Sequence, residues 1–348
     1  MLPLRGVVQH YAWGDKSAIP HILGTAADGR PWAEWWLGTH PGGPATTDGG
    51  TPLTEVAGEL PYLVKLLAAA APLSLQTHPD TGTAIEGFER EEATGCAADD
   101  PRRIYRDRSA KPEVLIALTP FDALCGFRPL GDTEQLLHSI GAIELAAMLR
   151  TDGLEAAVSA LYRGELDPVH VVRACRHHDS DEAHLVAELD RRYPTDPSVV
   201  VTLFLNRVHL SPGEAIYLTP GNLHAYVHGV GVEVMGASDN VVRGGMTNKH
   251  VDVDELLRVL RFEPLAEPVV VPIETSPGVW RYPTPAAPFV VTRLDVADHM
   301  PHRSEGRSVL LCTEGDSGPL HHGEAAYLAP GDELVLTGPA TVWAVTEA

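Results

Sequence analysis

The chain has 348 residues, of which 44% are hydrophobic and 21% charged, a composition typical of a folded globular protein with two or three domains. Its 26 basic and 47 acidic residues give a net charge of −21, so neither nucleic acids nor membranes are expected partners, because both bind positive surfaces. No apolar run reaches the roughly 18 residues of a transmembrane helix. There is no signal-peptide pattern, and the four cysteines form no CxxC pair, so we expect a cytoplasmic protein with reduced thiols.

The first part of the chain, up to about Arg128, consists of short apolar runs interrupted by glycine, proline and aspartate. This texture predicts strands and loops, although the alanine-rich stretch 66–71 also allows one helical turn. From Asp132 onward the spacing becomes helical, and Asp132 with Gln135 resembles a capping box. We therefore predict helices over 130–197, based on the apolar positions Leu136, Ile140, Leu154, Val158, Leu161, Leu185 and Leu189.

Strand patterns return after the helical segment. The run SVVVTLFLNRVHL at 198–210 predicts a strand, and a turn and further strands follow. Asp252 and Glu255 form a capping box for a short helix, after which the chain from Phe262 is proline-rich and then alternates β-like segments. The expected fold class is mainly β, with the helices inserted into a β framework.

One motif occurs twice, as GEAIYLTPG at 213–221 and as GEAAYLAPG at 323–331. Each copy predicts a strand, a Pro-Gly turn and a second strand. We interpret the pair as a duplicated β domain rather than a chance recurrence of one hairpin. His224 after the first copy corresponds to Leu334 after the second, so only the first keeps polar chemistry at this point.

Two short segments present polar side chains on one face of a predicted strand. Residues two apart in a strand point the same way, so Ser74, Gln76 and His78 should point together, as should Lys111 and Glu113. Taken separately, each segment has an ordinary interpretation, namely a hydrogen-bonded loop histidine and a surface ion pair.

A third segment places His224 in alternation with Tyr226 and with His228, which we expect to be a hydrogen-bonded core histidine. Two imidazoles and a carboxylate are a ligand set that Zn²⁺ favours, and an amide oxygen can supply a fourth ligand. The sequence therefore predicts a zinc site with one position left for water or substrate, formed by Gln76, His78, Glu113 and His224. The stretch SDNVVRGGMT at 238–247 adds polar groups around two glycines, where backbone can approach a ligand closely.

These segments together resemble class I mannose-6-phosphate isomerase (phosphomannose isomerase). The resemblance is most specific at PYLVKLLAAAAPLSLQTHPD (61–80), KPEVLIALTPFDALCGFRP (111–129) and the stretch 220–257, and it extends over 9–20 and 32–41. It implies a cupin-type β-barrel as catalytic domain, formed by 1–129 and 198–261. It also implies a helical domain inserted at 130–197, and a second cupin-like domain without a metal site at 262–348.

The resemblance also implies roles for individual residues. One Zn²⁺ per chain is expected on Gln76, His78, Glu113 and His224. Arg243, Lys111 and Asp239 are the expected catalytic residues, and Lys65 and Ser74 are the expected substrate-binding residues. One departure is Ala110, which precedes the KPE lysine where many family members carry histidine.

The reaction implied is the interconversion of mannose 6-phosphate and fructose 6-phosphate through a cis-enediol(ate), with zinc stabilising oxyanion charge. Lys111, Asp239 and a zinc-bound water remain alternative bases. A metal-dependent cupin dioxygenase and a non-catalytic sugar-binding cupin are the alternative functions. We expect a monomer whose partner is a small sugar phosphate.

Overall fold

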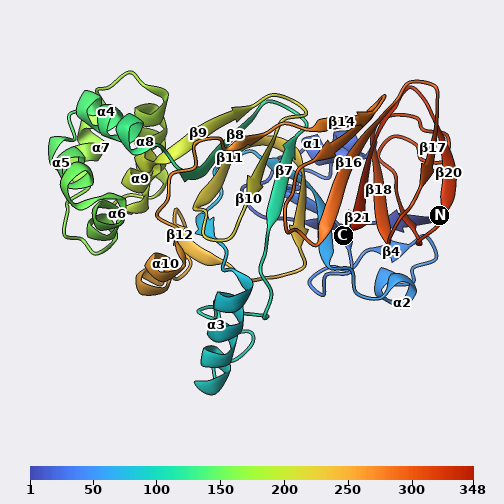
Figure 1. Cartoon of the computed structure of the whole chain (residues 1–348), viewed down its shortest axis with the longest axis horizontal. Helices are drawn as coiled ribbons and strands as arrows, with labels where there is room; N and C mark the ends of the chain where they lie inside the picture. The colour runs from blue at the N-terminus through green and yellow to red at the C-terminus, as the bar shows by residue number, and fades with distance from the viewer.

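The computed structural model describes all of residues 1–348, and it is mainly β, with two large antiparallel sheets and a group of helices at one end (Figure 1). The first sheet has eleven strands. Its main path runs through β13 (Val269–Val270), β10 (Ala215–Leu218), β7 (Glu113–Ala117), β11 (His224–Gly236), β5 (Tyr62–Ala69), β3 (Glu34–Gly38) and β2 (Val7–Gln9). The start of β11 also pairs with two strands that lead to the rest of this sheet, β6 (Leu75–Thr77) with β12 (Val242–Gly245), and β8 (Phe121–Phe127) with β9 (Leu205–Leu210).

The second sheet has eight strands and combines the two ends of the chain. Its order is β14 (Ile273–Ser276), β15 (Val279–Tyr282), β16 (Phe289–Val296), β21 (Ala340–Glu347), β18 (Ser308–Gly315), β19 (Ala325–Leu328), β1 (Leu2–Arg5) and β4 (Thr46–Thr47). A separate pair of strands accompanies it, β17 (His299–Arg303) with β20 (Glu333–Thr337). The first strand of the chain thus completes a sheet built mostly from the last eighty residues.

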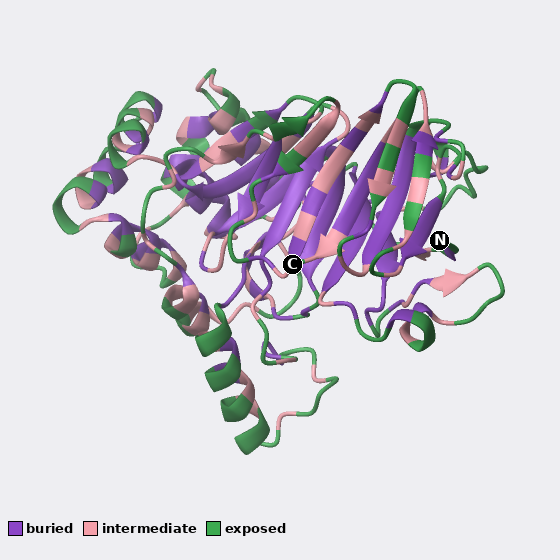
Figure 2. Cartoon of the chain, turned by 45° about the vertical axis from the view of Figure 1, so that its right-hand side comes forward, coloured by how far each residue is buried: buried purple, intermediate pink, exposed green.

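The two large sheets share one hydrophobic core. On β5, every second residue from Tyr62 onward packs into a cluster that also contains Trp343 of the second sheet. The intervening residues Leu63, Lys65 and Leu67 line a cavity on the other face of β5. Strands of both sheets are therefore largely buried, whereas the outer helices keep an exposed side (Figure 2). This alternation separates a structural face from a face that is available for chemistry.

The helices predicted for 130–197 are present. They pack around a core that they share with the neighbouring end of the first sheet, and they are α4 (Leu130–Ile140), α5 (Ile143–Asp152), α6 (Leu154–Tyr162), α7 (Val169–Cys175) and α8 (Asp181–Arg192). The other helices are α1 (Ala18–Ile22), α2 (Leu53–Ala57), α3 (Thr81–Ala93), α9 (Ser198–Val201) and α10 (Val253–Val259). None of these helices is long and apolar enough to cross a bilayer. The predicted cap of α10 is confirmed, since the Asp252 carboxylate accepts a hydrogen bond from the Glu255 backbone N–H.

The repeated motif forms the same structure twice. β10 and β19 occupy equivalent positions in the two copies, each preceded by a turn and each paired with antiparallel neighbours. Ala215 and Tyr217, like Ala325 and Tyr327, belong to the core between the sheets. The residues between them, Ile216 and Ala326, belong to two separate apolar clusters on the other faces of the two sheets. In neither copy does the strand before the Pro-Gly turn pair with the strand after it, so the repeat is a strand and a turn rather than a hairpin. The two copies are equivalent in packing as well as in sequence.

Three local predictions were wrong, and the helical turn that the sequence also allowed at 66–71 is absent. The run 198–210 is a strand only from Leu205, because 198–204 form α9 and a 3₁₀ turn (Thr202–Phe204). Every residue from Ser198 to Phe204 is buried, and an apolar run that is buried all round has no period that separates strand from helix. The stretch 66–71 is not helical, because it belongs mostly to β5 between two partner strands.

The other two errors concern the start of α4 and the presence of α3. α4 begins at Leu130 after Pro129, so Asp132 lies in its first turn and does not cap it. Proline is suited to the start of a helix, and the carboxylate still favours the positive end of the helix dipole. The region before Arg128 was predicted to hold strands and loops, but it contains the 13-residue α3, whose start is capped by the Asp80 carboxylate through the Thr83 N–H.

Candidate metal centre

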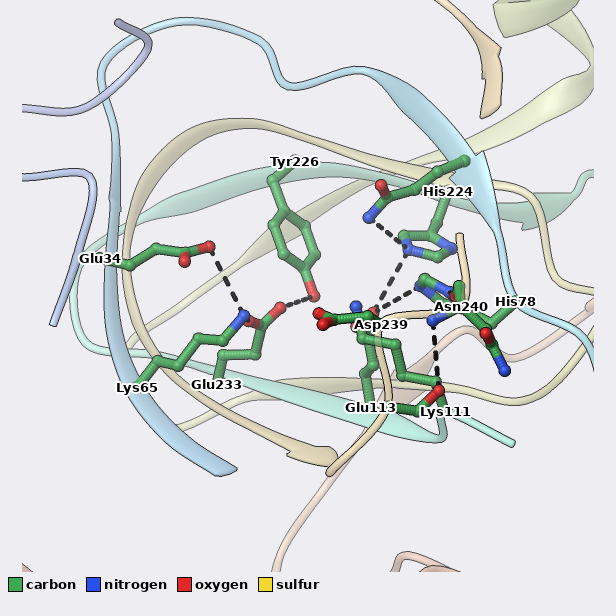
Figure 3. Close-up of polar contacts among 12 residues, drawn as sticks. Glu34, Lys65, His78, Lys111, Glu113, His224, Tyr226, Glu233, Asp239 and Asn240 are labelled. Carbon is green, nitrogen blue, oxygen red and sulfur yellow. Dashed lines mark hydrogen bonds and ion pairs between the residues drawn. The ribbon is translucent and has the colours of Figure 1, made fainter. Parts of the chain in front are cut away.

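Three polar side chains from separate segments converge inside the first sheet. His78 follows β6, Glu113 begins β7 and His224 begins β11. The Glu113 Oε2 atom lies 3.3 Å from Nε2 of His78 and 3.4 Å from Nε2 of His224. All three side chains are almost completely buried. This convergence is drawn in Figure 3, and the three residues form a group able to hold a metal ion.

Hydrogen bonds fix which nitrogen of each imidazole faces the group. Nδ1 of His78 lies 2.7 Å from the backbone carbonyl oxygen of Asn240, and Nδ1 of His224 lies 3.0 Å from that of Asn222. A carbonyl only accepts hydrogen bonds, so each Nδ1 carries the proton and donates it. Each Nε2 therefore directs a lone pair toward Glu113, which is the arrangement that metal-binding histidines use.

The donor set fits a zinc ion. Ligands at about 2.0–2.1 Å from a tetrahedral zinc lie roughly 3.3–3.4 Å apart, which is the spacing found between Glu113 and the two imidazoles. His78 Nε2 and Glu113 Oε2 are buried and have no hydrogen-bond partner, a costly state unless another group satisfies them. The residues present thus suit a metal ion chemically as well as geometrically.

Gln76 lies beside this group. The sheet register places it opposite His224 on one side and opposite Arg243 on the other. Its amide nitrogen as drawn is 3.4 Å from Nε2 of His224, and the two ends of an amide are exchanged by a 180° rotation, which would turn the oxygen toward the imidazole. Ser74 lines the same cavity two residues earlier, as the alternation predicted.

Lys111 and Glu113 share a face, as predicted from their spacing. Lys111 Nζ lies 3.1 Å from Glu113 Oε1, and both side chains are buried. Burial alone would raise the pKa of Glu113, but the positive charge of Lys111 opposes it, and that pKa lies well below its ordinary value. Burial lowers the pKa of His78. Glu113 is therefore an anion and His78 a neutral imidazole at neutral pH, the states in which both bind metals.

Lys65, expected to contact substrate, is held by two buried carboxylates. Its Nζ lies 2.7 Å from Glu233 Oε2 and 3.6 Å from Glu34 Oε1, and Tyr226 donates a 2.8 Å hydrogen bond to Glu233 (Figure 3). Burial would lower the pKa of Lys65, but Glu233 and Glu34 outweigh it and raise that pKa. Burial, together with Glu233, raises the pKa of Glu34 despite Lys65. Lys65 thus carries a permanent positive charge in the cavity wall.

Asp239 is paired with a histidine that the sequence analysis assigned no role. His40 Nδ1 accepts a 3.1 Å hydrogen bond from the Gly42 N–H, so its proton is on Nε2, which lies 3.3 Å from Asp239 Oδ1. The hydrogen bond from His40 lowers the pKa of Asp239, although partial burial opposes this. Asp239 is half-exposed and remains an anion at neutral pH.

These residues surround a cavity of about 790 Å³. Its wall includes Lys65, Ser74, Gln76, Lys111, Glu113, Asp239 and Arg243. Lys249 also lines it, and the side chains of Arg243 and Lys249 make no ion pair or hydrogen bond with the protein. Burial, and then the charge of Arg106, lower the pKa of Arg243, which stays protonated because a guanidinium titrates only above about pH 12. The cavity therefore has two cations free to bind an anion.

The sequence analysis missed Glu34, Glu233, His40 and Lys249. A signal existed for the first two, because each is a single carboxylate in a strand that is otherwise apolar, EWWLG and GVEVMG. No comparable signal marked His40, whose partner lies two hundred residues later in the chain. His228, expected in the core, is exposed because a bulge between Tyr226 and His228 interrupts the alternation.

Comparison with known proteins identifies the family. The model of the phosphomannose isomerase type I catalytic domain matches residues 1–130. The mannose-6-phosphate isomerase of Salmonella typhimurium is 32% identical over 97% of this chain and 94% of its own length. The chain belongs to the mannose-6-phosphate isomerase family. The resemblance deduced from the sequence is therefore confirmed, and so is the expectation of an isomerase of this family.

Solved structures of the mannose-6-phosphate isomerase family agree. The Salmonella typhimurium enzyme bound to fructose 6-phosphate and zinc has a TM-score of 0.86 and 31% identity, covering 100% of this chain and 99% of the other. The apo form of that enzyme gives the same TM-score at 30% identity. The Arabidopsis thaliana mannose-6-phosphate isomerase 1 is 29% identical over 96% of this chain and 88% of its own length.

Proposed function

We propose that this chain interconverts mannose 6-phosphate and fructose 6-phosphate with one zinc ion bound by Gln76, His78, Glu113 and His224. The observation that carries the proposal is the convergence of two unprotonated Nε2 atoms on one buried, ionised carboxylate. A relative with this overall structure binds fructose 6-phosphate and zinc. When bound, zinc would supply a Lewis acid that stabilises negative charge on the sugar oxygens.

The unpaired cations suit the phosphate of the substrate. Arg243 and Lys249 lie on the cavity wall without protein partners, and Arg106 is close enough to lower the pKa of both. A guanidinium can hold two phosphate or enediolate oxygens at once through charge-assisted hydrogen bonds. Arg243 and Lys249 would therefore hold a dianionic sugar phosphate inside a protein of net charge −21, with the charge of Arg106 nearby.

Asp239 and Lys111 are suited to the proton transfer. Asp239 is ionised and half-exposed at the cavity, and His40 fixes its orientation, so it can accept the C2 proton of the open-chain sugar. Lys111 is held by Glu113 at 3.1 Å and has further N–H groups with which to donate to a sugar oxygen. The proton taken from C2 then returns at C1, through a cis-enediol(ate).

We further propose the domain division deduced from the sequence. Residues 1–129 and 198–261 would form the catalytic cupin-type barrel, 130–197 an inserted helical domain and 262–348 a second, metal-free cupin-like domain. In support, each β unit has a separate interior cluster in addition to the shared core, and the helices follow one another along the chain and pack together at one end of the first sheet.

Two measurements test the proposed reaction. A coupled assay with mannose 6-phosphate, without oxygen, should give turnover that a chelator abolishes and added Zn²⁺ restores. Turnover without oxygen would exclude a dioxygenase, and absence of turnover in the zinc-loaded protein would contradict the proposal. In D₂O, NMR should show deuterium at C1 of the fructose 6-phosphate formed, because a proton held by Asp239 exchanges with solvent. Only protium at C1 after many turnovers would contradict this route.

A further inference from the structure

A second cavity, of about 1000 Å³, lies outside the catalytic pocket, between α8 and the strands β8, β9 and β11. In Figure 1 these strands reach toward the helices, and Arg207 of β9 donates a hydrogen bond to the backbone carbonyl of Asp181 at the start of α8. Four arginines and two histidines line this α8–β9 cleft: Arg176, Arg191, Arg192, Arg207, His184 and His228. Such a concentration of cations stands out in a chain of net charge −21.

Ion pairs within the protein involve three of the four arginines, and the pair made by Arg207 is the longest. Arg176 pairs with Asp190 at 2.5 Å and Arg192 with Glu188 at 2.9 Å. Arg191 makes no ion pair or hydrogen bond through its side chain and is exposed.

Arg207 and His228 are also incompletely satisfied. Arg207 lies 3.7 Å from Asp122, and its Nε is buried without a partner. Asp122 is itself bound to His209 at 2.5 Å, and His228 makes no hydrogen bond. Of the three acidic residues in the cleft, only Asp181 has a carboxylate without a partner. Cationic donors therefore outnumber the acceptors available to them.

We propose that the α8–β9 cleft binds a small phosphorylated molecule, at a site separate from the catalytic pocket. Guanidinium groups match the geometry of phosphate oxygens. Arg191 of α8 has no partner in the protein, and Arg207 of β9, on the opposite wall of the cleft, is held to Asp122 only by a 3.7 Å ion pair. The ligand is small rather than a nucleic acid, because the net charge of −21 of the whole chain repels a long polyanion.

The cleft and the catalytic pocket share two segments of chain. Ala70 and Pro72 line the cleft, while Pro72 and Ser74 line the catalytic pocket. At the end of α8, Arg192 lines the cleft and the next residue, Tyr193, lines the catalytic pocket. An anion bound between α8 and β9 would hold both segments, so it would restrict the two walls of the catalytic pocket that they form.

Calorimetric titration of the zinc-loaded protein tests the site with three probes, inorganic phosphate, glycerol 3-phosphate and ADP. The three arms distinguish free phosphate, a monoester and a nucleoside diphosphate. At least one should bind, and Arg191→Ala should weaken that binding about tenfold or more, which is the effect expected for a lost charge-assisted hydrogen bond. Arg281→Ala is the matched control, because Arg281 is exposed and unpaired on β15, away from the cleft.

The catalytic variant Arg243→Lys separates the two sites. Binding that survives in Arg243→Lys but weakens in Arg191→Ala supports the cleft. Binding lost only in Arg243→Lys belongs to the catalytic pocket and overturns the proposal, as does the absence of binding of all three probes. Hydrogen exchange at residues 70–74 should slow when the cleft is occupied, and unchanged exchange there would overturn the coupling. Neither readout depends on the proposed isomerase activity.

Discussion

The two β units, the eleven-stranded first sheet and the eight-stranded second sheet, each contain one copy of the repeated strand and turn, but their interiors contain opposite chemistry. In the second unit the inward positions of β18 and β19, such as Leu310 and Leu328, form a closed apolar cluster. In the first unit the inward positions of β7 and β11 include Glu113 and Glu233, beside apolar residues such as Leu115. The shared core between the sheets is apolar on both sides. A strand framework supported on one face thus leaves its other face free to hold charges.

The cost of the polar interior explains why its charges occur in pairs. An unpaired buried charge is strongly unfavourable, whereas Lys65 is flanked in register by Glu233 of β11 and by Trp36 of β3. Glu113 is balanced by Lys111 in the same way. The predictions below alter one unit or the other and follow the size of the expected effect.

Glu113→Gln removes the only anion of the candidate metal group. We expect loss of zinc and of nearly all turnover, because a neutral amide is a weaker zinc ligand than a carboxylate. Elemental analysis and the isomerase assay on the same sample measure both. A variant with one equivalent of zinc and wild-type turnover would remove Glu113 from the site.

Arg243→Lys keeps the positive charge of the first interior but loses the planar fork. We expect kcat to fall by about 10²-fold with zinc content unchanged, as is typical for loss of one transition-state contact. Near-wild-type kcat in the zinc-loaded variant would place Arg243 outside the reacting centre.

Leu310→Ala and Leu115→Ala compare the two interiors directly, since both residues are completely buried. Each should lower the free energy of unfolding by about 2–5 kcal/mol, measured by urea titration. Only Leu115→Ala should also reduce turnover, because Leu115 lies two residues after Glu113 in β7. A large loss of turnover at full zinc content in Leu310→Ala would contradict the separation of the two interiors.

Glu347→Gln tests the junction between the units. Arg307 binds the Glu347 carboxylate at 2.6 Å and also the backbone carbonyls of Ala57 and Glu59, and its hydrogen bond lowers the pKa of Glu347. A lowered carboxyl pKa stabilises the fold above the unfolded value of about 4.3, and this contribution disappears as the pH falls through the lowered pKa. The variant should be about 1 kcal/mol less stable at pH 7, since the pair is partly screened by solvent. Urea titrations should show the difference shrinking at pH 3, and a constant difference would contradict this.

Leu334→His is expected to change least. This substitution gives the second copy of the repeat the histidine that the first copy has at 224, and the register places residue 334 opposite His302. Zinc content should stay at one equivalent, because His302 and a histidine at 334 would have no carboxylate that completes a metal site with them; the only group able to hold a metal is His78, Glu113 and His224. A second equivalent of zinc would show that this one residue decides which copy of the repeat belongs to a metal site.

Local periodicity predicted much of the candidate site. The two-residue period correctly placed Ser74 and Gln76 on one cavity wall, and Lys111 beside Glu113. It also located the helices of 130–197, since their apolar spacing is independent of distant contacts. The cap of α10 was found for the same reason, because donor and acceptor are three residues apart.

What the sequence did not reveal depends on contacts between distant strands. Lys65 is placed between Glu233 and Trp36 by the order of β3, β5 and β11, and that order is not encoded locally. His40 acquires its role only by meeting Asp239. The valines of 198–201 predict a strand, but this segment is a helix. Its residues are buried, and packing there outweighs β propensity.

The pairing of β1 with β19 also constrains the order in which the chain folds during synthesis. Leu2 lies opposite Tyr327, so the first strand made has no sheet partner on that side until nearly the whole chain has left the ribosome. At roughly 5–20 residues per second, that interval is on the order of tens of seconds. This edge of β1 must remain unpaired, or bound by other proteins of the cell, during this time, whereas the other edge can pair early with β4. Both ends of the chain lie in one sheet. In a circular permutant with these ends joined and new termini elsewhere in the chain, β1 and β19 would be synthesised close together in time, and this interval would be shorter.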